Sequence, residues 1–326
     1  YSKFKRHYNI PGQRTLNGDI IHDICIDKNN NLWIGTEDAG LNKLNMKDHS
    51  YTSFNDMKGL SQNCIHGLAS IDNHLWIGTH ANGIDLMDIR TEKIIKHYTI
   101  SVNPYANKND IIVYLYKLQN NDLLVATALG VYQYNSQKDI FEKLSQFPNN
   151  CRIQTLFEDH DGVIWAGTSS KGLYYYNPAT SQHGEFKLDT VNTSRTINNI
   201  YEDRKNNLWF ATGDGIKIYD RSTQQTTKYD MQDGLPSNVI YRIEEDKKGN
   251  MWISTANGLA RLNPKNHKIK VFKKEHGLTS NQFNSNLIVS KNFPFNRKYI
   301  YHRLIIMIQI ITSYTKRLSL LKKESP

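Results

Sequence analysis

Histidine is the residue type in this chain with the most specific potential chemistry, because its imidazole binds metals and transfers protons near neutral pH. The chain has twelve histidines. Those in the first half of the chain are His22, His66, His74, His80, His97 and His160, with His7 and His49. None of them forms a His-x-x-x-His or His-Glu-x-x-His motif, so the sequence predicts no zinc site.

The three cysteines and the acidic residues likewise indicate structure rather than catalysis. Cys25, Cys64 and Cys151 are odd in number and unevenly spaced, which is typical of small buried thiols and not of a disulfide framework. Asp159 and Asp161 are similar to the start of a calcium loop but lack its later Glu, so we interpret them as a hairpin turn. The sequence contains no Gly-x-Ser-x-Gly elbow and no phosphate-binding loop. We therefore expect no metal, no cofactor and no enzymatic activity.

The charge of the chain is concentrated at one end. The formal net charge is +10, but residues 291–326 hold eight of the basic residues and one of the acidic ones. The remainder has 33 basic and 30 acidic residues, a net charge of +3, with both signs interleaved. A nucleic-acid interface would need a basic stripe on one element, so nucleic acid is not an expected partner.

The elements that must position any site come from an internal repeat. Its anchor is a Leu-Trp-Ile-Gly-Thr-like strand that begins at Leu32, Leu75, Leu123, Ile164, Leu208 and Met251, with Leu124 in place of Trp in the third copy. The anchors are 43, 48, 41, 44 and 43 residues apart. A period of 40 to 50 residues built of short strands is typical of β-propeller blades. A linear solenoid is the alternative topology, but four antiparallel strands per repeat favour blades.

A glycine follows the Trp position of the anchor by six or seven residues and predicts a tight hairpin between the second and third strands of each repeat. These glycines are Gly40, Gly83, Gly130, Gly172, Gly215 and Gly258. The fold class predicted is all-β, a β-propeller of seven four-stranded antiparallel blades with an incomplete seventh. The propeller spans residues 1–290: a closing strand at 1–8, six clear blades at about 20–272, and the start of a seventh at 275–290.

Residues 291–326 depart from the repeat and are rich in Ile, Lys and Arg. We interpret them as a truncated or frame-disturbed end, with an amphipathic helix leading toward a membrane as the alternative. We expect poor order from about Phe293 and a tendency to aggregate, because the run from Leu304 to Ile311 is apolar and mostly β-branched. Substitute strands formed by Lys298 to Ile311 are the competing outcome.

The five tryptophans recur at one position of one strand, which predicts core packing rather than a platform for stacking sugars. Loops that vary between copies are the better ligand candidates, since loops carry function on a rigid frame. The hairpins between strands two and three and the links between blades lie on one face of a propeller. The candidate ligand-binding residues on that face are Glu37, Asp38, His80, Asn82, Tyr105, Arg152, Lys171, Arg195, Asp214, Asn238 and Asn257.

The best-preserved repeat carries a family resemblance. Gly234-Leu235-Pro236-Ser237-Asn238, then Glu245-Asp246, then the run from Gly249 to Leu259 resembles the two-component regulator propeller repeat, and the resemblance covers residues 1 to about 290. It implies a periplasmic sensor region of a hybrid two-component system that responds to oligosaccharides. It also implies a second propeller, signalling modules and a homodimer as partners, and none of those modules is visible in this sequence.

The sequence thus predicts a non-catalytic sensing or interaction propeller. A propeller polysaccharide lyase or glycoside hydrolase is one alternative, which needs convergent carboxylates or a metal at the central channel. The start of the inner strands offers Asn, Ser and Thr instead, with Asp110 and Asp189 in the links as the acids to test. A scaffold propeller for protein partners is the other alternative, although the Gly-His and Trp-Asp pairs of that class are absent.

Overall fold

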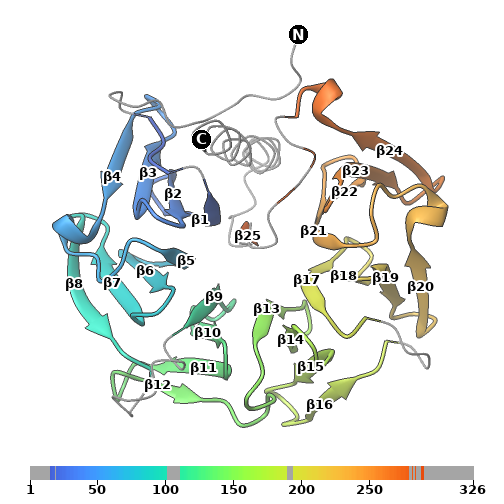
Figure 1. Ribbon diagram of the computed structural model, residues 1–326. Helices are drawn as coiled ribbons and strands as arrows, with labels where there is room; N and C mark the ends of the chain where they lie inside the picture. Colours follow the sequence, from blue (N-terminus) through green and yellow to red (C-terminus); the bar gives the residue numbers. More distant parts are fainter. Residues whose placement is uncertain are drawn as a thin grey trace, which may run out of the picture.

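The computed structural model describes residues 15–18, 20–100, 111–188, 194–278, 281 and 283, together with the backbone of 288–289. The predicted closing strand at 1–8, the tail at 291–326 and the candidate residue Tyr105 lie outside these residues, as do Asp110 and Asp189. The described chain forms six four-stranded antiparallel sheets arranged around a ring (Figure 1). The predicted all-β propeller is therefore confirmed.

Each of the first three blades is a meander of four consecutive strands. Blade 1 comprises β1 (Ile21–Ile26), β2 (Asn31–Thr36), β3 (Leu41–Asn45) and β4 (Tyr51–Phe54). Blade 2 comprises β5 (Ile65–Ile71), β6 (His74–Thr79), β7 (Ile84–Asp88) and β8 (Lys93–Tyr98). Blade 3 comprises β9 (Ile112–Lys117), β10 (Leu123–Thr127), β11 (Gly130–Asn135) and β12 (Ile140–Lys143).

The next three blades repeat this order. Blade 4 comprises β13 (Ile153–Glu158), β14 (Ile164–Thr168), β15 (Leu173–Tyr176) and β16 (His183–Phe186). Blade 5 comprises β17 (Ile197–Glu202), β18 (Leu208–Thr212), β19 (Gly215–Asp220) and β20 (Gln225–Tyr229). Blade 6 comprises β21 (Ile240–Glu245), β22 (Met251–Thr255), β23 (Gly258–Asn263) and β24 (Lys268–Phe272). Three short 3-10 helices follow outer strands: η1 (Asp56–Lys58), η2 (Met231–Asp233) and η3 (Lys274–His276).

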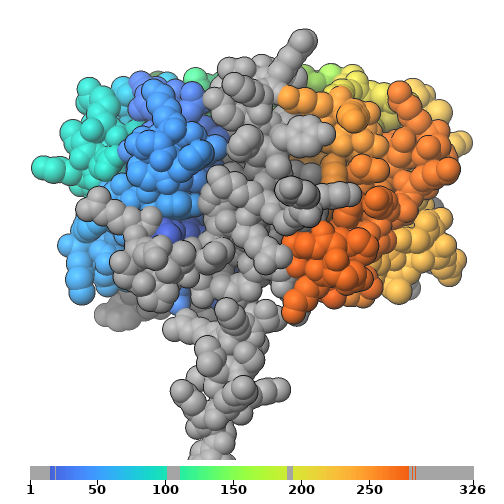
Figure 2. Space-filling model, turned by 90° about the horizontal axis from the view of Figure 1, so that it is seen from above, coloured from blue at the N-terminus to red at the C-terminus, as the bar shows by residue number. Residues whose placement is uncertain are grey.

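The first strand of every blade faces the centre of the ring and the fourth lies at the rim (Figure 1). A short strand, β25 (Ile288–Val289), pairs in parallel with β1 at the inner edge of blade 1. It lies in the segment predicted to begin a seventh blade, while the blade count of seven itself stays a prediction. Viewed from the side, blades 1 and 2 and blade 6 lie at opposite sides of a disc (Figure 2).

The threonine of the anchor strand closes the hairpin between strands two and three. In each blade its buried Oγ1 donates a hydrogen bond to the carbonyl of the hairpin glycine, at 2.7 to 3.0 Å. These threonines are Thr36, Thr79, Thr127, Thr168, Thr212 and Thr255. The six predicted hairpin glycines all have positive φ, as a closing residue without a Cβ should. Two features of the repeat therefore specify the hairpin, the threonine hydrogen bond and the glycine at positive φ.

Replacing Gly83 with Ala is expected to lower the free energy of unfolding by about 2 kcal/mol or more. The φ of Gly83 is +72°, and an added Cβ would lie 2.2 Å from the carbonyl oxygen of Tyr98. Gly162→Ala is the matched control, because φ is +76° there and no atom lies within 4 Å of the added Cβ. Denaturant unfolding should show a distinctly smaller loss for Gly162→Ala. Equal losses would mean that the backbone conformation alone, and not the close packing of the hairpin, is responsible.

The tryptophans are core residues, as predicted. Trp33, Trp76, Trp165 and Trp209 are at most 5% exposed, and Trp252 is half-buried. In four blades the indole N–H donates to an Asp six residues earlier, in the turn between strands one and two. The pairs are Trp33 with Asp27, Trp165 with Asp159, Trp209 with Asp203 and Trp252 with Asp246, at 2.7 to 3.0 Å.

Candidate functional site

The inner strands are the elements that bring residues of different blades together. In all six, the register shifts between the first and third residues, so that a β-bulge leaves the second residue outside the ladder. Bulges re-aim side chains and often lie next to functional sites. The second residues, in blade order, are His22, His66, Val113, Gln154, Asn198 and Tyr241.

Polar side chains at or beside these bulges join neighbouring inner strands in three places: β1 to β5, β5 to β9 and β17 to β21. Nδ1 of His66 hydrogen-bonds the carbonyl of Ile112 at 3.1 Å, and Nδ2 of Asn198 donates to the carbonyl of Ile240 at 2.8 Å. At the third position, Oδ2 of Asp23 accepts the N–H of Leu68 at 2.7 Å. In blade 5, Oδ1 of Asn199 accepts the N–H of Ile243 at 3.0 Å. These bonds satisfy backbone groups at the inner edges of blades 2, 3 and 6, where no further described strand pairs.

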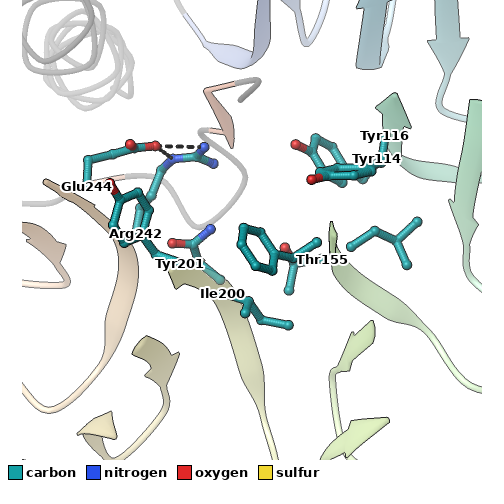
Figure 3. A pocket seen from close by; sticks show the side chains of 10 residues that line it. Tyr114, Tyr116, Thr155, Ile200, Tyr201, Arg242 and Glu244 are labelled. Carbon is teal, nitrogen blue, oxygen red and sulfur yellow. Dashed lines mark hydrogen bonds and ion pairs between the residues drawn. The ribbon is translucent and has the colours of Figure 1, made fainter. Parts of the chain in front are cut away.

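The third and fifth residues of the inner strands of blades 3 to 6 line a pocket at the centre of the ring (Figure 3). They are Tyr114 and Tyr116, Thr155 and Phe157, Asn199 and Tyr201, and Arg242 and Glu244. The enclosed part of this pocket is small, about 10 Å³, and opens into about 260 Å³ of space that includes solvent. Its walls therefore combine aromatic rings with amide, hydroxyl and charged groups, the mixture typical of small-ligand sites.

A buried ion pair forms one wall of this pocket. The guanidinium of Arg242 contacts Oε1 of Glu244 through Nε at 3.2 Å and Nη2 at 3.1 Å (Figure 3). Arg242 is 6% exposed, so its charge is held in place by a partner rather than by solvent. An Arg fixed in this way presents donors in a rigid plane, which suits hydroxyl or carboxylate groups of a ligand.

The pocket tyrosines act as neutral hydrogen-bonding groups. Burial raises the pKa of Tyr114, Tyr116 and Tyr201 above the usual value for a phenol, and nearby carboxylates add to the shift. These phenols keep their protons at neutral pH and cannot serve as bases there. The hydroxyl of Tyr116 accepts the N–H of Glu158 at 3.0 Å. None of the ten pocket-lining residues is a Ser, Cys or His, so the pocket offers recognition without a nucleophile of those types.

The predicted ligand face exists as a geometric feature. The N–H of Glu37 donates to the carbonyl of Ile20 at 3.0 Å, and the N–H of His80 to that of Cys64 at 2.9 Å. Likewise the N–H of Ser169 donates to the carbonyl of Arg152 at 3.1 Å. Hairpins and incoming links therefore lie side by side, as the topology of a blade predicts.

Several predicted ligand residues on this face have structural contacts. Oδ1 of Asn238 accepts the N–H of Met231, Nδ2 of Asn257 donates to Pro236, and Nδ2 of Asn82 donates to Ser61. The charged candidates Lys171, Arg195 and Asp214 contact Asn149, Glu185 and Lys228 respectively. Among the described residues, each of these six is held by its own local partner.

Glu37 and His80, by contrast, lie beside two histidines that no sequence motif singles out, His22 and His66. Glu37 contacts Nε2 of His22, and the ring of His80 lies 4.6 Å from that of His66. Cys64 lies beside them, and burial raises the pKa of its thiol, with the charges of Glu37 and Asp38 adding to the shift. Burial also lowers the pKa of His22, and the charge of Arg152 acts weakly in the same direction. His22, Glu37, Cys64 and His66 are residues that could together hold a metal ion.

Among the residues that the structure describes, none of the helices has the length and apolar character needed to cross a membrane.

Comparison with known proteins identifies the repeat. Residues 15–38, 146–170, 193–214 and 234–257 match the two component regulator propeller family, so the chain carries repeats of this family, as the resemblance predicts. The sequence has no match among curated proteins.

Solved structures show the same fold. The extracellular domain of a putative hybrid two component system from B. thetaiotaomicron is 19% identical with a TM-score of 0.68, over 85% of this chain and 38% of that one. The extracellular domain of a putative one component system from the same organism is 19% identical with a TM-score of 0.62, over 86% and 44%. Virginiamycin B lyase from Staphylococcus aureus is 18% identical with a TM-score of 0.64, over 87% and 90%. This chain therefore spans less than half of the first two and nearly all of the lyase.

Proposed function

We propose that this propeller, whose repeats are of the two-component regulator type, is a non-catalytic sensing module that binds a ligand in its central pocket. The observation that carries the proposal is the match of four repeats to the two component regulator propeller family. The two neighbours described as extracellular domains of regulatory systems support an extracytoplasmic location, which we propose to be the periplasm. The module would work with a second propeller and signalling modules, and as a homodimer.

We propose oligosaccharides as the ligand class. Aromatic faces such as those of Tyr114 and Tyr201 suit the apolar faces of sugar rings, while Asn199 and Arg242 offer groups that recognise hydroxyls. The enclosed part of the pocket has room for about one water molecule, so we expect only a terminal group at one end of a chain to enter it. The hairpin face is where the rest of such a chain would extend, with Glu37 and His80 as proposed contacts.

Calorimetric titration of the purified chain with a panel of oligosaccharides tests this proposal. We expect Arg242→Lys to weaken binding by about tenfold or more, because Lys keeps the charge but loses the planar donors. Arg90→Lys is the matched control, since Arg90 is exposed and pairs only locally with Asp88 at 3.0 Å. Circular dichroism should show that both variants are folded.

Two outcomes would contradict this function. The first is that no oligosaccharide produces heat or a thermal shift with the folded chain. The second is turnover of a polysaccharide or other substrate by the purified protein, which would favour the lyase alternative suggested by the similarity to virginiamycin B lyase. Binding that Arg242→Lys leaves unchanged would retain a sensing role but place the ligand outside the central pocket.

A further inference from the structure

Four side chains with metal-binding chemistry meet where blades 1 and 2 adjoin. His22 and His66 occupy the bulge positions of β1 and β5, Glu37 follows β2, and Cys64 lies in the link before β5. One potential ligand atom from each residue lies within 4.8 Å of those of the other three. The rings of His22 and His66 are 4.3 Å apart between centroids. The group thus draws on two blades and the link between them.

His22 is the most deeply buried member of this group. It is only 3% exposed, and its Nδ1 has no hydrogen-bond partner among the described residues. Nε2 of the same ring contacts the carboxylate of Glu37. Because the lone pairs of the two ring nitrogens point in divergent directions, Nε2 is the nitrogen that this ring would offer to an ion shared with Glu37.

His66 is already oriented as a metal-binding imidazole would be. Its Nδ1 lies 3.1 Å from the carbonyl oxygen of Ile112, and a carbonyl can only accept, so Nδ1 must carry the proton. The neutral ring then has its lone pair on Nε2. A histidine that ligates a metal through one nitrogen commonly donates the other N–H to a carbonyl or carboxylate.

We propose that His22, Glu37, Cys64 and His66 form a zinc-type transition-metal site that joins blades 1 and 2. Two imidazoles, a carboxylate and a thiolate supply the four ligands that Zn²⁺ takes in closed structural sites. Glu37 and the thiolate of Cys64 would balance the charge of the ion, the thiol proton being released to solvent on binding. The site is separate from the central pocket, although it shares Glu37 with the hairpin-face contacts proposed above, and its existence does not depend on the proposed sensing function.

The test uses the untagged full chain after treatment with a chelator, titrated with ZnCl₂ and, as a spectroscopic probe, with CoCl₂. We expect one equivalent of Zn²⁺ to bind and to raise the melting temperature, because the ion binds the folded state. With Co²⁺ we expect the charge-transfer band that arises only from a cobalt–thiolate bond. Cys64→Ser should abolish this band and weaken Zn²⁺ binding by at least about tenfold.

Cys151→Ser is the matched control, because Cys151 is also a free cysteine but is not part of the cluster. It should retain the cobalt band and the zinc-dependent rise in melting temperature. Cys64 is only partly buried, so its Ser variant is expected to fold. His22→Gln should also weaken zinc binding, with circular dichroism as the check on folding. No cobalt–thiolate band in the wild-type chain, or zinc binding unchanged in Cys64→Ser, would overturn the proposal.

Discussion

Replacing either Trp33 or Asp27 with Leu is expected to lower the free energy of unfolding by about 3 kcal/mol or more, and the double variant to lose less than the sum. Trp33 is fully buried and its Nε1 donates to Oδ2 of Asp27 at 2.9 Å. Trp33→Leu removes packing and deprives a buried carboxylate of a donor. Asp27→Leu leaves the buried indole N–H without its acceptor. The double variant removes both partners of this bond, while the donors of Asn29 and Asn31 lose the carboxylate equally in Asp27→Leu and in the double variant.

Blade 3 shows that the chain tolerates the paired loss. Leu124 stands at its Trp position, and Leu118, six residues earlier, stands at its Asp position. Both leucines are buried in one hydrophobic cluster. An apolar pair therefore replaces the hydrogen-bonded pair within the same fold, which is the arrangement that the double variant reproduces.

Denaturant unfolding of the wild-type chain, both single variants and the double variant measures this coupling. We expect the double variant to be about 1 to 3 kcal/mol more stable than additivity predicts. The combination of Trp33→Leu with Asp203→Leu is the control, because Asp203 pairs with Trp209 in a different blade. Those two losses should add. Additive losses for Asp27 and Trp33 as well would show that the tryptophan contributes by packing alone.

The repeat made the scaffold predictable because each blade has the same four strands and the same hairpin residues. Glycines at positive φ, such as Gly40, and the buried threonines of the anchors could be assigned from spacing. The Asp–Trp pair was also within reach of the sequence, since Asp27 and Trp33 are six residues apart and blade 3 changes both positions. The pair becomes visible in the sequence when each tryptophan is compared together with the turn that precedes it.

The central pocket was not predicted because its residues are about 42 positions apart and meet only when the ring forms. Local motifs cannot show that Thr155, Asn199 and Arg242 share a wall. The available signal was the variation at the third position of the inner strands, beside constant Ile or Leu positions. Asn238, a predicted ligand residue, recurs in the repeat. Its Oδ1 accepts the N–H of Met231, just as Oδ1 of Asn63 accepts the N–H of Asp56. A residue that recurs in register supports the repeat, whereas one that varies can serve the ligand.

Asp23→Asn is expected to remove a loss of stability that the wild-type chain suffers as the pH rises. Asp23 is fully buried at the third position of β1, and burial raises its pKa well above the usual value. The N–H groups of Leu68 and Ile24 and the charge of Arg242 act in the opposite direction but do not offset it. Because the folded carboxyl holds its proton more tightly than the unfolded one, folding takes up a proton. This contribution to stability is complete below about pH 4 and is lost as the pH rises through the raised pKa of the folded state.

The expected signature is a difference between the two proteins that changes with pH. Oδ1 of Asp23 accepts the N–H of Ile24 at 2.9 Å and Oδ2 that of Leu68 at 2.7 Å, whereas Asn has one acceptor oxygen. Asp23→Asn should therefore cost about 1 kcal/mol in acid, where the carboxyl is neutral. The amide fits the position, because Asn199 holds the N–H of Ile243 in the same way in blade 5. As the pH rises the wild-type chain must bury a carboxylate and the variant need not. The stability difference between them therefore shrinks and then changes sign in favour of the variant.

Unfolding free energies of the two proteins across this pH range test the assignment. Asp48→Asn is the exposed control, and its stability should change with pH as that of the wild-type chain does. A difference between wild type and Asp23→Asn that stays constant with pH would mean that another group takes up the proton.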